Sequence, residues 1–204
     1  MAGVYRCDRQ GPLETFTATL PSDQFNVLLL TPSKASLIDT ANGSLAVEAL
    51  DVMESSEVEF GLDCLRPVSL KALRERLASS PGYYHLVHFD GFDVDAEGLT
   101  FQPINGEAER ITASDLAHSL NVGQVPVALL TCSSPQYAQT VAGNLAQSGV
   151  PNVVVLPYPL SGVGRELFAQ SFYSELVHGS DAAQAVAAAR KALMDRPHRP
   201  SGAG

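Results

Sequence analysis

The chain of 204 residues has little cysteine, few basic side chains and no long apolar run. Its three cysteines, Cys7, Cys64 and Cys132, cannot all pair with one another, and none lies in a CxxC or CxxH cluster of the kind that binds zinc. We therefore expect free thiols and no metal site. Cys64 lies in a strand-like run, where we expect it to be a small buried apolar residue.

Basic residues are outnumbered, because 13 lysines and arginines stand against 22 aspartates and glutamates, for a net charge of −9. Nucleic-acid backbones and anionic membranes both favour basic surfaces, so neither is expected as a partner, whereas a basic protein or peptide is favoured. No segment approaches the roughly 20 apolar residues that cross a bilayer. The start MAGVYRCDRQ has no apolar core of the kind a signal peptide needs, so we expect a cytoplasmic protein.

Several widespread motifs are also missing. The chain has no GxxxxGK(S/T) phosphate loop and no GxGxxG after its first predicted strand, so a nucleotide site would lack its usual backbone cradle. It has no GxSxG elbow, which argues against an α/β-hydrolase. No cofactor is therefore expected, and a flavodoxin-like nucleotide or phospho-signalling module is the weakest of the functions considered.

Apolar runs alternate with segments of helical periodicity. Runs such as FNVLLLT and VPVALLT are apolar at nearly every position, which is typical of strands buried on both faces. We predict strands near residues 25–31, 58–65, 84–90, 126–132 and 152–157, and helices near residues 45–53, 69–77, 111–120, 134–149, 163–179 and 181–194. This order predicts an α/β fold with a mostly parallel central sheet and helices on both faces.

The remaining segments set the domain boundaries. Residues 92–102 alternate after an acidic turn, which suits a short hairpin placed outside the main sheet. Residues 1–24 are polar and are interpreted as a tail or one short extra strand, and residues 195–204 have the composition of a disordered tail. We therefore predict one domain over residues 25–194.

Two of the predicted strands end in potentially reactive side chains. His88 lies near the end of YHLVHF, and Cys132 ends VPVALLTC. Catalytic groups of parallel α/β sheets gather outside the carboxyl ends of the strands, so we expect His88 and Cys132 at adjacent strand ends. A thiol beside an imidazole is the minimal equipment for nucleophilic acyl transfer, although a lone cysteine at a strand end is also often a packing residue.

Acidic residues follow His88 in the stretch DGFDVDAEG. The group has two interpretations, an exposed turn or an edge that binds cationic side chains. Its members are Asp90, Asp93, Asp95 and Glu97.

The order of several segments resembles the CHAT domain, a caspase-like family often found beside tetratricopeptide repeats. The segments are YYHLVHFDG, the strand VPVALLTC and the helical pair FxxxFYxEL and AxxxAR, within a likeness over roughly residues 25–194. The resemblance implies a caspase-like three-layer sandwich. For active members it also implies a Cys–His dyad that cleaves peptide bonds without a metal or cofactor.

The chain departs from the family pattern at the position of the catalytic base. Active members read HFxGHG after the third strand, with the second histidine as catalytic base, whereas this chain reads HFDGFD. By this match Cys132 keeps the nucleophile position, Phe92 takes the base position and Asp93 takes that of a glycine. Thr131 replaces the alanine that usually precedes the nucleophile. A phenyl ring cannot accept a proton.

Two hypotheses of function follow. The first is a degenerate, weakly active or inactive cysteine-peptidase homologue that acts as an interaction or regulatory module, with a protein or peptide partner or a separate sensor or repeat-domain chain. The alternative is an active cysteine endopeptidase with Cys132 as nucleophile and His88 as base. In both, the residues expected at the substrate are Asp90, Gly91, Phe92 and Asp93.

Overall fold

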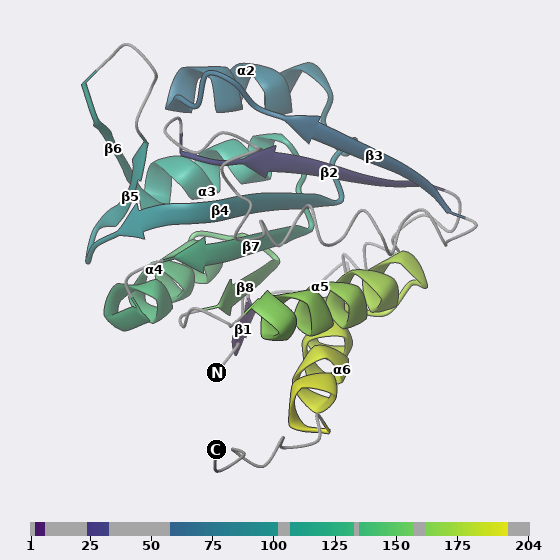
Figure 1. The fold of residues 1–204 in the computed structure, drawn as a ribbon. Helices are drawn as coiled ribbons and strands as arrows, with labels where there is room; N and C mark the ends of the chain where they lie inside the picture. The colour runs from purple at the N-terminus through teal and green to yellow at the C-terminus, as the bar shows by residue number, and fades with distance from the viewer. Residues whose placement is uncertain are drawn as a thin grey trace.

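The computed structural model of the chain describes residues 3–6, 24–32, 58–101, 107–132, 135–156 and 162–195. These residues form an eight-stranded sheet whose main path runs β1, β8, β7, β4, β2, β3 (Figure 1). The strands are β1 (Gly3–Arg6), β2 (Gln24–Leu30), β3 (Glu59–Cys64), β4 (Leu86–Val94), β5 (Gly98–Phe101), β6 (Glu109–Thr112), β7 (Val127–Cys132) and β8 (Asn152–Leu156). The helices are α2 (Leu70–Ser79), α3 (Ala113–Val122), α4 (Pro135–Gln147), α5 (Gly162–Val177) and α6 (Ala182–Met194).

The five strands predicted from apolar runs are confirmed as β2, β3, β4, β7 and β8. Each is parallel to its neighbours in this group. All but the edge strand β3 are buried along most of their length, as expected for strands covered on both faces. The apolar runs therefore located the centre of the sheet to within a few residues.

The prediction of a mostly parallel sheet is wrong, because the sheet as a whole is mixed. β1 is antiparallel to β8, β5 is antiparallel to β4, and β6 is antiparallel to β5. The hairpin predicted outside the sheet in fact joins it, since β4 continues to Val94. A tight turn then reverses the chain, with one carboxyl oxygen of Asp95 accepting the backbone N–H groups of Glu97 and Gly98.

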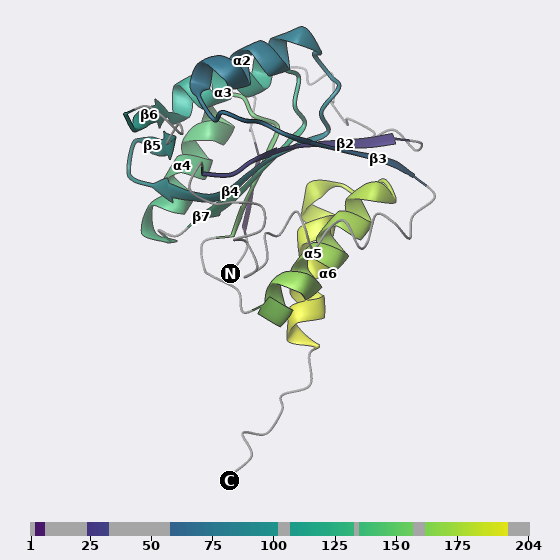
Figure 2. The same cartoon turned by 45° about the horizontal axis from the view of Figure 1, so that its top comes forward.

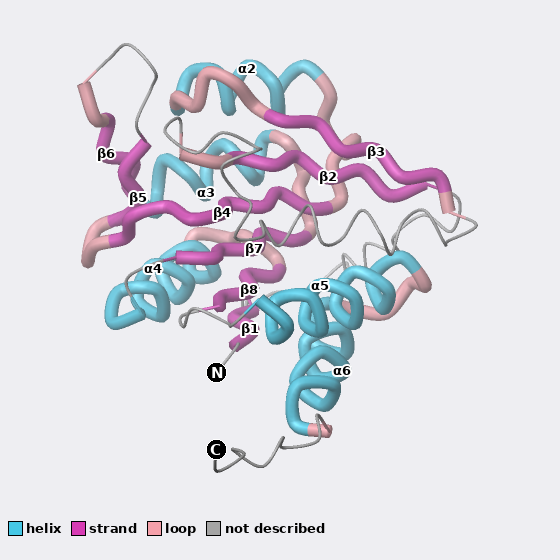
Figure 3. The backbone as a smooth tube through the Cα atoms, in the orientation of Figure 1, coloured by secondary structure: helices cyan, strands magenta, loops and turns pink. Residues whose placement is uncertain are grey.

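Helices cover both faces of the sheet, as predicted. α2, α3 and α4 pack on one face and α5 and α6 on the other, and each face has its own apolar cluster (Figure 2). We call these the α2–α4 face and the α5–α6 face. The alternation of strand and helix along the backbone is visible in Figure 3. This arrangement is consistent with a caspase-like fold.

The helix starts and stops follow local chemistry. Thr112 caps α3 by accepting the N–H of Asp115 at 3.1 Å, and the two residues have the Ser/Thr-x-x-Asp spacing typical of a helix start. Asp181 caps α6, and a capping box with Gln184 completes its first turn. α4 is followed by Gly149, whose φ of 98° suits a helix stop.

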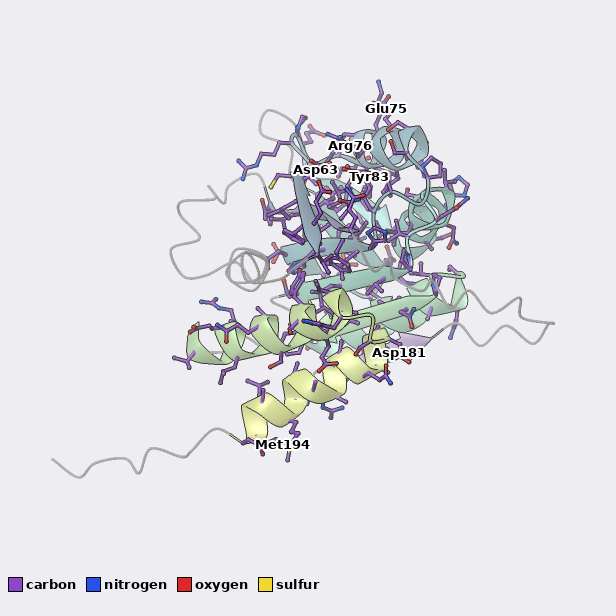
Figure 4. All side chains as sticks on the ribbon, turned by 90° about the vertical axis from the view of Figure 1, so that its right-hand side faces the viewer. Asp63, Glu75, Arg76, Tyr83, Asp181 and Met194 are labelled. Atoms are coloured by element: carbon purple, nitrogen blue, oxygen red, sulfur yellow. The ribbon has the colours of Figure 1, made fainter. Side chains whose placement is uncertain are left out.

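Cys64 ends β3, the last strand on the described path of the sheet, and corrects one expectation. Cys64 is exposed rather than buried, because within the described residues β3 pairs only with β2. The side chain of Asp63, the residue before it, faces α2 (Figure 4). It accepts the hydroxyl of Tyr84 at 2.6 Å and lies 3.7 Å from the guanidinium of Arg76.

Some expectations concern other parts of the chain. The predicted helix at residues 45–53, most of the predicted N-terminal tail and residues 196–204 of the predicted C-terminal tail lie outside the described residues. The last described helix, α6, ends at Met194, whose side chain is exposed (Figure 4). No described helix is long and apolar enough to cross a membrane.

Candidate functional site

A bulge in β4 decides which side chain faces Cys132. The parallel register between β4 and β7 pairs Asp90 with Thr131. The next pair is Phe92 with Cys132, so Gly91 is an extra residue between the two pairs. Gly91 has a φ of 76°, in the left-handed region that favours glycine. The bulge places residue 92 on the opposite face from residue 90, where strict alternation would place both on one face.

Phe92 and Cys132 share the α2–α4 face. Both belong to the apolar cluster there, with Phe92 fully buried and Cys132 only 8% exposed. The ring of Phe92 lies 5.1 Å from that of Phe101 and 6.2 Å from that of Phe89, measured between centroids. A buried hydrocarbon ring therefore occupies the position across from the thiol.

His88 lies on the α5–α6 face. It pairs in register with Leu129 of β7, whose side chain belongs to the apolar cluster of that face. Its ring is fully buried, and its Nδ1 lies 3.0 Å from the hydroxyl oxygen of Tyr173 in α5. The prediction of adjacent strand ends is therefore only partly right. The two residues lie on adjacent strands, but His88 is the third residue of β4 and not near its end, and it lies on the opposite face of the sheet from Cys132.

The surroundings of His88 favour its neutral form. Burial lowers the pKa of the His88 imidazole, and the carboxylate of Asp90, 4.0 Å from Nε2, opposes this in part. Burial also raises the pKa of the Tyr173 hydroxyl, which therefore keeps its proton. We assign Tyr173 as donor to Nδ1, which leaves the ring proton on Nε2, facing Asp90. Nε2 has no hydrogen-bond partner within the described residues.

Asp90 belongs to a small polar cluster beside the bulge. Its carboxyl oxygen Oδ1 accepts the hydroxyl of Thr131 at an O–O distance of 2.5 Å. The same hydroxyl oxygen accepts the backbone N–H of Gly91 at 3.2 Å. The side chain of Asp90 is 15% exposed, so this cluster lies close to the protein surface.

The remaining acidic residues behave mainly as a structural turn. Arg110 of β6 donates to Asp95 through its Nε at 2.9 Å and through an Nη, and to Glu97 at 3.0 Å. The backbone N–H of Glu97, the Arg110 guanidinium and the N–H of Gly98 lower the pKa of Asp95. The single guanidinium of Arg110 thus offsets part of the negative charge of Asp95 and Glu97. These contacts support the interpretation as a turn for Asp95 and Glu97.

The four residues predicted at the substrate differ in their contacts and in their exposure. Asp90 and Gly91 are bonded to Thr131, and Phe92 is buried. Asp93 is exposed, beyond the bulge. Of these four residues, Gly91 and Asp93 are exposed to solvent.

The sequence did not predict a role in the site for two residues. Tyr173 lies in the FYxEL stretch that resembles the family, and its hydroxyl on an otherwise apolar helix face could have indicated a buried polar contact. Thr131 was noted only as a departure from the family pattern. Its contacts depend on the register of β4 against β7, which the sequence does not reveal.

The register of the sheet thus sets Phe92 opposite Cys132, while His88 lies on the other face. No three His, Cys, Asp or Glu side chains gather as a metal site within the part of the chain that the structure describes. A family model of the CHAT domain matches residues 35–201, more than half of the chain. No curated protein matches the chain. The chain therefore belongs to the CHAT-domain family, a caspase-like family related to peptidases.

Proposed function

We propose that this chain is a degenerate cysteine-peptidase homologue, weakly active or inactive, that acts as an interaction or regulatory module. The observation that carries the proposal is the pairing of Phe92 with Cys132. In the family pattern the residue at position 92 takes the proton of the thiol. A fully buried phenyl ring in that place has no atom that accepts one.

The position of His88 supports the same proposal. To serve as base, an imidazole nitrogen must come within hydrogen-bonding reach of the thiol. His88 instead lies on the α5–α6 face and is bonded to Tyr173, whereas Cys132 lies on the α2–α4 face. The alternative enzyme, with His88 as base, would need this buried contact to break and the side chain to cross the sheet.

Charge favours a basic partner. The chain carries a net charge of −9, and Asp93 is exposed next to the bulge. We propose that a protein or peptide with lysine or arginine residues docks beside Asp93 in the cytoplasm, either free or as part of a separate sensor or repeat-domain chain. Complementary charge of this kind accelerates association and weakens with added salt.

Peptide hydrolysis tests the proposal. We expect the wild type and Cys132→Ala to be nearly indistinguishable on fluorogenic peptides, beginning with those that have a basic residue before the scissile bond. An ordinary enzymatic rate in the wild type, about 1 s⁻¹ or faster, would overturn the proposal if both Cys132→Ala and His88→Ala abolished it. That result would establish the endopeptidase with His88 as base.

A further inference from the structure

We propose that Thr131 is a positioning residue that locks the β4 bulge and thereby fixes residue 92 across from Cys132. The inference rests on the proposed function in one respect, the assignment of Cys132 to the nucleophile position. Its tests measure the backbone and the thiol rather than peptide hydrolysis. The two proposals can therefore fail separately.

The hydroxyl of Thr131 joins the two residues that start the bulge. It has one proton, which goes to Oδ1 of Asp90 because that oxygen, at 2.5 Å, is much closer than the backbone oxygen of Phe89, at 3.4 Å. Its oxygen then accepts the N–H of Gly91 at 3.2 Å. One side chain on β7 therefore holds both Asp90, the residue before the bulge, and Gly91, the extra residue.

Gly91 needs such a restraint. Glycine reaches positive and negative φ with similar ease, so the residue type alone does not select the observed φ of 76°. Apart from its two chain neighbours, no described residue has a heavy atom within 4 Å of where a Cβ of Gly91 would be, so side-chain packing at that position does not select the conformation either. The bond to Thr131 supplies a restraint, and the conformation of Gly91 in turn decides the face of residue 92.

Thr131 departs from the family pattern that the chain resembles. Alanine usually precedes the nucleophile in that pattern, and alanine has no hydroxyl to join Asp90 and Gly91. The family also has glycine where this chain has Asp93. Because Thr131 contacts Asp90 and Gly91, its effect should act through the bulge and appear at position 92.

The first test uses a chain whose only thiol is Cys132, made by Cys7→Ser and Cys64→Ser, and adds Phe92→His. An imidazole facing Cys132 should promote the thiolate and speed alkylation by iodoacetamide at pH 7 by about tenfold or more over the Phe92 chain. Adding Thr131→Val, which keeps the shape but removes the hydroxyl, should cancel most of this gain. Adding Thr131→Ser, which restores the hydroxyl, should keep it to within about twofold.

The second test reads the lock itself in the chain that retains Phe92. Hydrogen exchange of the Gly91 amide, followed by NMR, should be about fivefold to tenfold faster in Thr131→Val than in Thr131→Ser, because the valine removes the acceptor. Amides of α6, such as that of Ala189, serve as the control and should exchange equally in both variants. A change confined to Gly91 and its neighbours separates positioning from a general loss of stability.

The outcomes are decisive in each case. Equal alkylation gains in the valine and serine chains, or equal Gly91 exchange, would overturn the inference. If the valine variant lacks a cooperative thermal transition, Thr131→Ala takes its place. Loss of the faster alkylation in the Thr131→Ser chain would by itself also overturn the inference. Wild-type peptidase activity would count against the proposed function and would leave these comparisons unchanged.

Discussion

Phe92→His is expected to raise peptide hydrolysis by about 10²–10⁴-fold over the wild type, the usual contribution of a general base. The reason is geometric, since Gly91 turns position 92 onto the face of Cys132 and the register pairs the two residues. An imidazole there could accept the thiol proton, and the resulting thiolate would attack the scissile carbonyl carbon. Hydrolysis of fluorogenic peptides by the purified variant measures the gain.

Matched variants separate a restored base from a loosened core. Phe92→Leu removes the ring without adding a base and should stay at the wild-type rate. Phe92→His combined with Cys132→Ala should lose the whole gain. Because Phe92 is fully buried between Phe89 and Phe101, each variant must first show a cooperative thermal transition. A folded Phe92→His protein no faster than Phe92→Leu, even after Asp93→Gly, would contradict the geometry described for this site.

The free energy of unfolding is expected to fall as the pH drops from 7 to 5. Burial lowers the pKa of His88 and of His85 in the folded chain, so between the folded pKa and the unfolded value of about 6.5 the unfolded chain binds more protons. Stability is therefore greatest above about pH 6.5 and is lost below it, by at most about 1.4 kcal/mol per pH unit for each histidine. Urea unfolding at both pH values measures the loss.

His88→Gln isolates the contribution of the buried ring. This variant should be less stable at pH 7, because it disturbs the contact with Tyr173, but its unfolding free energy should depend less on pH than that of the wild type. His118→Gln, at an exposed position on α3, should keep the wild-type dependence. If His88→Gln kept the full wild-type dependence on pH, the folded His88 would not be held neutral.

The sequence predicted the parallel strands of the sheet but not the pairing of its antiparallel strands. Long apolar runs located β2, β4, β7 and β8, because strands covered on both faces need apolar residues at nearly every position. The direction of β1 and the β5–β6 hairpin depends on pairing between distant segments and on the turn at Asp95, and apolar patterning does not encode either. The prediction of a mostly parallel sheet failed for that reason.

The candidate site divides in the same way. The apolar runs brought His88 and Cys132 to adjacent strands, but the face of each side chain depends on the register and on the bulge at Gly91. Alternation alone would have put residues 88, 90 and 92 on one face. The contact of His88 with Tyr173 joins residues 85 positions apart, so no local pattern indicated it.

The pH dependence of Cys132 alkylation in the wild-type site, measured in the Cys7→Ser, Cys64→Ser protein, tests the central claim most directly. The phenyl ring of Phe92 brings no charge that would favour the thiolate of Cys132, and burial disfavours it. We expect a midpoint at or above the ordinary cysteine value of about 8.5. A midpoint well below 7 would show an activated thiolate and would contradict the account of a site that has lost its base.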